Sequence, residues 1–528
     1  MSKRVGDDDR TRNQARRPSG TGAPRFEPRG EGLVLAAPLR FEARALRRGA
    51  PAAKAIRTGI GRRRARRASG RIGHAPGNVV AVTGFAGALS PELEPGDVVV
   101  ATEVRGADEP VQCAATDLVA SMLRRAGLRV HTGPIVSVPR IVRGTARARL
   151  AASGALAVDM ESAWLARGCA GRPWAVVRTV VDTPGRELHR PIATVTGALR
   201  AYQALSRVAE ALSQWSDATE ERRIVLANPR ASCAGVERAI GVVERALERF
   251  GAPLYVRRQI VHNRHVVSDL ERRGAVFVDE VEQVPVGARL VFSAHGVSPA
   301  VRQAAESRDL DVIDATCPLV SKVHAEARRF SSAGYTIMLV GHAGHDEIEG
   351  TMGEAPESVR LVEDIHEARE VQAADPDRVA YLTQTTLAVD ETSEIVETLR
   401  GRFPGLAGPR TDDICYATQN RQDAVRELAK GCDAILVVGS SNSSNSMRLV
   451  EVAERAGCRA RLVDGIADVD PAWLEGARTV GVTAGASAPE RIVQDLVTSL
   501  ASLGPLEVLE NDGISENVHF GLPVELKG

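Results

Sequence analysis

Three related segments, each an apolar run or loop with a single cysteine, lie in the C-terminal part of the 528-residue chain. They read IVLANPRASCAGV, DVIDATCPLV and TDDICYATQN and contain Cys233, Cys317 and Cys415. Cys233 and Cys317 are 84 positions apart, and Cys317 and Cys415 are 98 apart, so the spacing is nearly regular. Because α/β folds bind ligands at the loops that follow strand ends, this repeat predicts three α/β units that each offer one thiol to a common centre.

The seven cysteines include no CxxC pair and are odd in number, which is unlike a disulfide framework. No apolar run reaches the ~18 residues that span a membrane. The N-terminus carries charges but no apolar region of the kind found in signal peptides. We therefore expect a protein of the reducing cytoplasm with no membrane partner.

Positive charge gathers at the start of the chain, where residues 1–75 carry 20 Lys and Arg against 6 Asp and Glu. The first 29 residues are polar and rich in Arg, Gly and Pro, and we expect a disordered basic tail. Such an arm could touch RNA. However, few aromatic residues lie among the arginines, and abundant Ala, Arg and Gly suit a high-GC genome, so a nucleic-acid partner is not expected.

Two α/β regions follow the tail. From Gly32 onward, short β-branched runs such as NVVAVTGFAGAL and WAVVRTVVDT are separated by turns and alternate with helix-like stretches. A polar segment then precedes a second region of the same kind that begins near Ile224. We predict an α/β domain over residues 30–213, a linker over 214–222, and a second α/β domain over 223–525.

The second region resembles a known enzyme family. Nine blocks occur in order, among them NPRASCAGVERAI, DATCPLVSKVH, GHAGHDEIEGTMG and VVGSSNSSNSMRL. Together they resemble the 4-hydroxy-3-methylbut-2-enyl diphosphate reductase family over about residues 223–525. The resemblance implies reductive dehydroxylation of an allylic diphosphate to isopentenyl and dimethylallyl diphosphate, the last step of the non-mevalonate pathway. It also implies a pseudo-threefold arrangement of α/β units around an iron–sulfur cluster.

The resemblance implies that Cys233, Cys317 and Cys415 hold a 4Fe-4S cluster. Such clusters usually take four cysteines, so three leave one iron open to a ligand. Structural zinc is the alternative, but it wants a fourth ligand and commonly uses close CxxC pairs. No flavin or nicotinamide motif is visible, so a ferredoxin or flavodoxin is the expected electron donor. Cys432 and Cys458 lie outside the matching blocks and are expected to be inert.

The remaining roles also come from the resemblance. A diphosphate needs several hydrogen-bond donors, and Ser-rich loops at a helix N-terminus provide them. The matching substrate-binding positions are His262, His295, His345, Thr385, Ser443, Ser444, Asn445 and Ser487. The catalytic positions are Glu347, which would supply a proton for the loss of water, together with Thr385 and His345.

Two places depart from the family's usual pattern. Ala231 and Ser232 stand where Gly and Phe are common beside the first cysteine, and the change matters if φ is positive there. Asp346 stands where Pro is common.

The first region resembles, more weakly, the nucleoside phosphorylase and nucleosidase superfamily. The segments on which this resemblance rests are APLRFEARAL, TGIG, VTGFAGAL, AVDMESAWLA and VRTVVDT. The first of them, APLRFEARAL, is expected to form a strand. The resemblance implies that a nucleoside binds here and that its glycosidic bond is broken. Glu161 would bind the ribose hydroxyls, with Met160 packed against the sugar. Asp182 would protonate the leaving base, Glu42 would activate water, and Gly84 to Gly87 would let the backbone approach the base or sugar.

A second interpretation of the whole chain is a sensor in which an iron–sulfur cluster detects oxygen or iron beside a vestigial nucleoside-binding domain. A sensor needs only the thiolates. The presence of Glu347, Thr385 and the full diphosphate set favours the enzyme.

Overall fold

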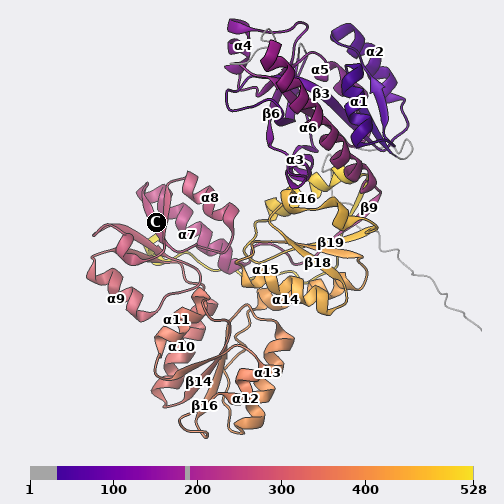
Figure 1. Ribbon diagram of the computed structural model, residues 1–528. Helices are drawn as coiled ribbons and strands as arrows, with labels where there is room; N and C mark the ends of the chain where they lie inside the picture. Colours follow the sequence, from indigo (N-terminus) through magenta and orange to yellow (C-terminus); the bar gives the residue numbers. More distant parts are fainter. Residues whose placement is uncertain (1–31, 107, 185–190, 527–528) are drawn as a thin grey trace, which may run out of the picture.

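The computed structural model describes residues 32–106, 108–184 and 191–526, so the tail predicted to be disordered lies outside the described residues. Figure 1 shows an N-terminal unit and three α/β lobes that follow it along the chain. Within the described ranges, no helix is both long and apolar enough to cross a membrane.

The N-terminal unit contains an eight-stranded mixed sheet in the order β2-β1-β3-β7-β6-β4-β5, with β8 paired to both β3 and β4. Because β7 pairs with β3 and with β6, the strands β3, β8, β4, β6 and β7 form a closed ring. The strands are β1 (Leu33–Ala37), β2 (Lys54–Arg57), β3 (Val79–Ala88), β4 (Val98–Arg105), β5 (Val111–Gln112), β6 (Val130–Ser137), β7 (Ala157–Asp159) and β8 (Trp174–Asp182).

The α-helices in the described part of this unit are α1 (Arg40–Gly49), α2 (Arg62–Gly73), α3 (Thr116–Arg125), α4 (Gly144–Ala151), α5 (Ser162–Leu165) and α6 (Pro191–Asp217). The expectation of a strand at APLRFEARAL was wrong, since most of this segment lies in α1. Its buried residues Glu42, Ala43, Ala45 and Leu46 recur at helical spacing.

The first lobe has a parallel sheet in the order β11-β10-β12-β13, and the second has one in the order β15-β14-β16. The elements of the first lobe are β10 (Leu254–Arg257), β11 (Ala275–Val278), β12 (Arg289–Phe292), β13 (Asp311–Asp314), α7 (Ala234–Phe250), α8 (Arg264–Arg272) and α9 (Pro299–Ser307). Those of the second are β14 (Thr336–Val340), β15 (Val359–Val362), β16 (Val379–Thr383), α10 (Pro318–Ser332), α11 (Asp346–Glu354), α12 (Ile365–Glu370) and α13 (Val389–Arg402).

The third lobe has a five-stranded parallel sheet in the order β18-β17-β19-β9-β20, so it contains the first strand after the N-terminal unit. Its elements are β9 (Arg222–Leu226), β17 (Ala434–Val438), β18 (Arg459–Val463), β19 (Thr479–Ala484), β20 (Leu506–Glu510), α14 (Tyr416–Ala429), α15 (Ser444–Arg455) and α16 (Glu490–Leu500). Short 3₁₀ helices are η1 (Ala166–Gly168), η2 (Val281–Gln283), η3 (Ile466–Asp468), η4 (Pro471–Leu474), η5 (Ala501–Leu503) and η6 (Val524–Leu526).

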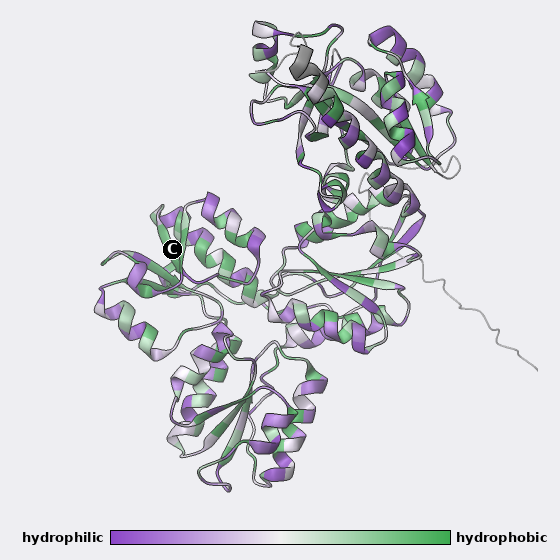
Figure 2. Cartoon of the chain, in the orientation of Figure 1, coloured by the Kyte–Doolittle hydropathy of each residue, from purple (hydrophilic) through white to green (hydrophobic). Residues whose placement is uncertain are grey.

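Hydrophobic strands explain the parallel sheets. The segments TIMLV of β14 and AILVV of β17 are buried at every position, as expected for strands covered by helices on both faces. Figure 2 shows mostly hydrophobic strands inside each lobe and helices with mixed hydropathy around them. The expected α/β class with three α/β units after a first α/β domain is confirmed.

The N-terminal unit packs directly on the third lobe. One hydrophobic cluster runs from the N-terminal sheet through α6 into the third sheet, with Trp215 fully buried inside it. The indole Nε1 of Trp215 donates to the carbonyl of Ser502 at 2.9 Å. The predicted linker therefore holds the end of α6 and the start of β9.

Candidate functional sites

The three cysteines occupy equivalent positions, since Cys233, Cys317 and Cys415 are the N-cap residues of α7, α10 and α14. Each backbone N–H donates to a carbonyl just beyond a strand end. These carbonyls belong to Ala486 after β19, Ala294 after β12 and Thr385 after β16, at 3.3, 3.0 and 3.0 Å. The repeated contact directs one thiol from each helix N-terminus into a single cavity between the lobes.

The cysteine cluster fits a metal-bound state. Burial raises the pKa of the Cys317 thiol to about 11 and that of the Cys415 thiol to about 12. Both thiols are therefore protonated near neutral pH unless a metal holds them as thiolates. A Cβ on Gly235 would lie 2.7 Å from Cys317 Sγ, so the absence of a side chain there keeps space open beside the sulfur.

A single zinc ion does not fit these cysteines. Within the described ranges, the one set of three potential ligands whose ligand atoms all lie within 4.8 Å of one another is His262, His295 and Asp346. The three sulfurs are therefore too dispersed for one tetrahedral ion, whereas a cluster of several metal atoms can span them.

A second group of polar side chains faces the same cavity. The rings of His262 and His295 are stacked with centroids 4.1 Å apart, and the His345 ring lies edge-on to both. Burial is the largest cause that lowers the pKa of His345 to about 4, and electrostatic repulsion from His262 is the next largest. Burial also lowers the pKa of His262 and, well below its usual range, that of His295.

The N-terminus of α15 also lines this cavity. Ser443 is its N-cap residue, and its hydroxyl lies 3.2 Å from that of Ser487. The amide oxygen of Asn445 accepts from the backbone N–H of Ala486 at 2.8 Å. Ser444 Oγ accepts from the Thr386 hydroxyl at 3.1 Å. A helix N-terminus with hydroxyl and amide groups is a suitable site for an anion.

The remaining predicted acid, Glu347, is buried at the start of α11. Its carboxylate accepts from the backbone N–H of Thr385 at 2.7 Å and from the Thr385 hydroxyl at 3.0 Å. Burial raises the pKa of Glu347 to about 7, and the hydrogen bonds from Thr385 oppose that shift. The carboxyl can therefore carry a proton near neutral pH.

One cavity thus brings together every residue predicted for the reductase site. The sequence interpretation missed Tyr416 and Phe520, which also line it. Tyr416 directly follows Cys415 and was discoverable from that position, whereas Phe520 comes from a C-terminal segment with no recognisable pattern.

The altered loop beside Cys233 has an unusual backbone, because φ of Ala231 is 61°, a conformation that favours glycine. The guanidinium of Arg421 donates to the Ala231 carbonyl at 2.7 and 3.0 Å and holds the loop in place. Ser232 donates its hydroxyl to the carbonyl of Ala488 at 3.2 Å.

A second cavity, of about 340 Å³, lies in the N-terminal unit and is lined by Glu42, Met160, Glu161 and Asp182. Gly87 lines this cavity, whereas Gly84 does not. A Cβ there would come within 3.0 Å of Glu42 Oε1 and 2.8 Å of Arg178 Nη1, so this glycine instead lets those two side chains approach the strand.

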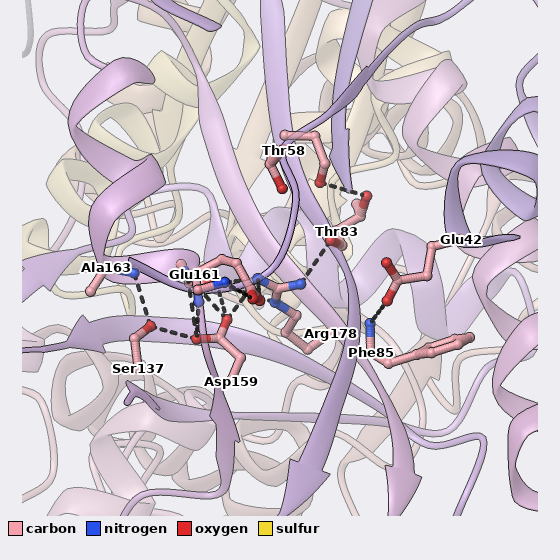
Figure 3. Close-up of polar contacts among 12 residues, drawn as sticks. Glu42, Thr58, Thr83, Phe85, Ser137, Asp159, Glu161, Ala163 and Arg178 are labelled. Carbon is pink, nitrogen blue, oxygen red and sulfur yellow. Dashed lines mark hydrogen bonds and ion pairs between the residues drawn. The ribbon is translucent and has the colours of Figure 1, made fainter. Parts of the chain in front are cut away.

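Arg178 on β8 organises the polar end of this cavity and was missed by the sequence interpretation. It is fully buried, and its guanidinium donates to the Thr83 carbonyl at 2.8 Å and lies 2.7 Å from Asp159 and 3.8 Å from Glu161 (Figure 3). A charged residue inside the apolar run WAVVRTVVD was the available signal.

The two glutamates are both buried. Burial, opposed by Arg178, raises the pKa of Glu161 to about 7. Burial also raises the pKa of Glu42, whose carboxylate accepts from the backbone N–H of Phe85 at 2.8 Å (Figure 3). Asp182 is held differently, because buried Arg147 on α4 forms an ion pair with it at 2.9 Å.

Two protein families match different parts of the chain. The model of the LytB protein family matches residues 224–501, more than half of the chain. The chain belongs to the LytB protein family. The phosphorylase superfamily matches residues 29–214, which covers the N-terminal unit.

Relatives of the LytB region are reductases by name. A 4-hydroxy-3-methylbut-2-enyl diphosphate reductase from Nocardia farcinica is 57% identical over 59% of this chain and 93% of its own length. The enzyme of that name from Leifsonia xyli is 58% identical over 58% of this chain and 91% of its own. The solved structure of the E-1-hydroxy-2-methyl-but-2-enyl-4-diphosphate reductase from Plasmodium falciparum covers 58% of this chain and 97% of its own. Its identity is 38% and its TM-score 0.56.

Proposed function

We propose that the three lobes reduce 4-hydroxy-3-methylbut-2-enyl diphosphate to isopentenyl and dimethylallyl diphosphate. The observation that carries this proposal is the single cavity that joins three thiols, a buried carboxyl and an anion-binding wall. Replacing the hydroxyl by hydrogen, with release of water, consumes two electrons and two protons. The names of the LytB relatives support the same reaction.

Cys233, Cys317 and Cys415 would hold a 4Fe-4S cluster, which supplies the electrons and an iron open to the substrate hydroxyl. The protein contributes the placement of the thiols at three helix N-termini, where the helix dipole favours negative charge.

The diphosphate would lie between the histidine rings and the N-terminus of α15. Backbone N–H groups, Ser443, Ser444, Asn445 and Ser487 would donate hydrogen bonds there, and the three imidazoles line the same cavity. This placement would direct the other end of a short substrate toward the cysteines.

Glu347 would hold the proton that the departing hydroxyl takes. Its burial raises the pKa to about 7, so the carboxyl can carry a proton near neutral pH, and Thr385 fixes both of its oxygens. His345, the N-cap residue of α11, accepts at Nδ1 from the backbone N–H of Glu347 at 3.3 Å and so helps to position the acid.

A reductase of this kind needs an external electron donor, and we propose a ferredoxin or flavodoxin. All seven cysteines are free, which agrees with the reducing cytoplasm that we propose as its setting. An iron–sulfur sensor would not need the buried acid, whose retention supports the enzyme.

The test is substrate turnover by anaerobically reconstituted protein, with Glu347→Gln as the matched variant. The proposal predicts both products from the natural protein and severely slowed turnover from the variant with its cluster spectrum intact. Equal turnover by the two proteins would remove Glu347 from the acid role.

We propose a second activity, cleavage of a nucleoside, for the N-terminal unit. The match to the phosphorylase superfamily and a cavity lined by Glu42, Glu161 and Asp182 support it. Release of free base from a panel of purine nucleosides, with and without phosphate, is the test. Absence of release from the whole panel would favour a vestigial domain.

A further inference from the structure

The histidine cluster of the reductase cavity is assembled across two lobes. His262 follows β10 and His295 follows β12 in the first lobe, whereas His345 stands at the start of α11 in the second. The cluster therefore depends on how these two lobes are held together. Asp346, the residue that departs from the family's usual Pro, is the first residue of α11 and lies at this junction.

Asp346, in the second lobe, contacts two residues of the first lobe. One carboxylate oxygen is bound by the guanidinium of Arg258, which lies just beyond β10. The other lies 3.7 Å from Nδ1 of His295. Arg258 also forms an ion pair with Glu349, one turn further along α11, at 2.8 Å. The pair of Arg258 and Asp346 thus connects the first and second lobes beside His295.

Two ring nitrogens in this cluster lack partners. Nδ1 of His262 and Nδ1 of His295 are buried and accept or donate no hydrogen bond among the described residues. A buried polar atom without a partner is costly, so its presence at a binding site calls for an explanation. An imidazole that donates through one nitrogen to a phosphate oxygen and has a carboxylate at the other is favoured as imidazolium.

We propose that Asp346 is a positioning residue for diphosphate binding, fixing the two lobes through Arg258 and accepting the Nδ1–H of His295 when the anion is bound. This inference rests on the proposed reductase function. It explains why an acidic residue beside an anion site can help binding, because its charge is already neutralised by Arg258 and is shared with the imidazole rather than presented to the ligand.

The charged groups around His295 are few. They are His262 from the first lobe, His345 and Asp346 from the second, and Arg258 with its other partners Glu280 and Glu349. Burial and the neighbouring rings lower the pKa of His295, so it is neutral before the ligand arrives. The diphosphate and Asp346 together would favour its protonated form.

A divalent metal on His262, His295 and Asp346 is the competing occupant, because their ligand atoms lie within 4.8 Å of one another. The guanidinium of Arg258 already binds Asp346 and would repel a second cation there. Metal analysis of the reconstituted protein therefore belongs in the test.

The experiment compares natural protein, Asp346→Asn and Glu349→Gln as reconstituted holoenzymes. Turnover and the binding of inorganic pyrophosphate are measured between pH 6 and pH 8. Glu349→Gln removes the other acidic partner of Arg258 on α11 without touching His295. We expect Asp346→Asn to raise KM and the Kd for pyrophosphate about tenfold at pH 8 and less at pH 6, where solvent protons sustain the imidazolium. We expect kcat to change less than about twofold and Glu349→Gln to behave as the natural protein does.

Three outcomes would overturn the inference. They are an unchanged KM in Asp346→Asn, a pH-independent change that Glu349→Gln shares, and a stoichiometric divalent metal that Asp346→Asn loses. If the natural holoenzyme binds pyrophosphate without turning over the substrate, the reductase proposal fails while the binding comparison still decides the role of Asp346.

Discussion

Thr385 donates two hydrogen bonds to Glu347, one from its backbone and one from its hydroxyl, at 2.7 and 3.0 Å. Both bonds favour the ionised carboxylate, whereas burial favours the protonated acid and is the larger influence on the pKa. The pKa of Glu347 therefore depends on the balance between its burial and the two hydrogen bonds from Thr385.

Thr385→Val should move that balance. The pKa of Glu347 is about 7, and the carboxyl holds its proton when the solution pH is below that value. We therefore expect kcat to fall as pH rises through about 7. Removing the Thr385 hydroxyl removes one hydrogen bond that lowers the pKa of Glu347. The falling limb of the pH profile of kcat should therefore move to higher pH by about one unit.

The measurement is kcat against pH. Thr392→Val, a buried threonine on α13 outside the cavity, is the control and should leave the limb in place. A shift to lower pH in Thr385→Val would contradict the assignment.

Cys317→Ser should abolish cluster loading and lower turnover by more than about 100-fold. Loss of a residue that binds the metal should lower affinity and activity more than the loss of a residue that only supports such a ligand. Iron content and visible absorbance of reconstituted protein provide the measurement. Cys432→Ser is the matched control, since Cys432 does not line the cavity and should load normally. Full loading and full activity in Cys317→Ser would rule out this cysteine as a ligand.

Ala231→Gly should change the free energy of unfolding by less than about 1 kcal/mol. Relief of the positive φ is worth ~1–2 kcal/mol, and it is offset by backbone entropy of ~0.5–1 kcal/mol and loss of a buried methyl group of ~0.8 kcal/mol. Ala231→Val should destabilise by about 2 kcal/mol or more, because a β-branched residue is strained at this φ.

Thermal unfolding of both Ala231 variants checks this account. Asp309→Gly is a useful comparison, because φ is 52° there but the side chain is exposed, so relief of strain should produce a net gain in stability. A well-tolerated Val at position 231 would show that the loop adopts another conformation.

Glu161→Gln should reduce nucleoside cleavage about 10- to 100-fold through the loss of a charged hydrogen bond while leaving reductase turnover unchanged. Its carboxylate is fixed by the backbone N–H of Gly61 at 3.0 Å and by Arg178, and it lines the N-terminal cavity but not the reductase cavity. The reciprocal control is Cys317→Ser, which should retain nucleoside cleavage. Loss of both activities in either variant would indicate a folding defect.

The repeated segments predicted the convergence of the three thiols, whereas the other residues of the reductase site came from the resemblance to a family. Each cysteine follows a strand or loop of the same kind, and parallel sheets place such loops at one edge, so convergence of the thiols was predictable. The diphosphate set was predictable from its blocks. The helix at APLRFEARAL was not, because its pattern of short apolar stretches also suits a strand.

Contacts between elements far apart in the chain could not be predicted. The ion pair of Arg258 and Asp346 joins two lobes, and that of Arg147 and Asp182 joins α4 to β8. Arginine is so frequent in this chain that no pattern distinguishes those two from exposed ones. The packing of Trp215 against the third lobe likewise depends on the assembled fold.

The most direct test of the central claim is turnover of 4-hydroxy-3-methylbut-2-enyl diphosphate by the full chain, reconstituted without oxygen and supplied with a chemical reductant. The account predicts formation of isopentenyl and dimethylallyl diphosphate, lost in Cys317→Ser. No product from protein whose cluster is shown to be intact would contradict it and would favour the sensor.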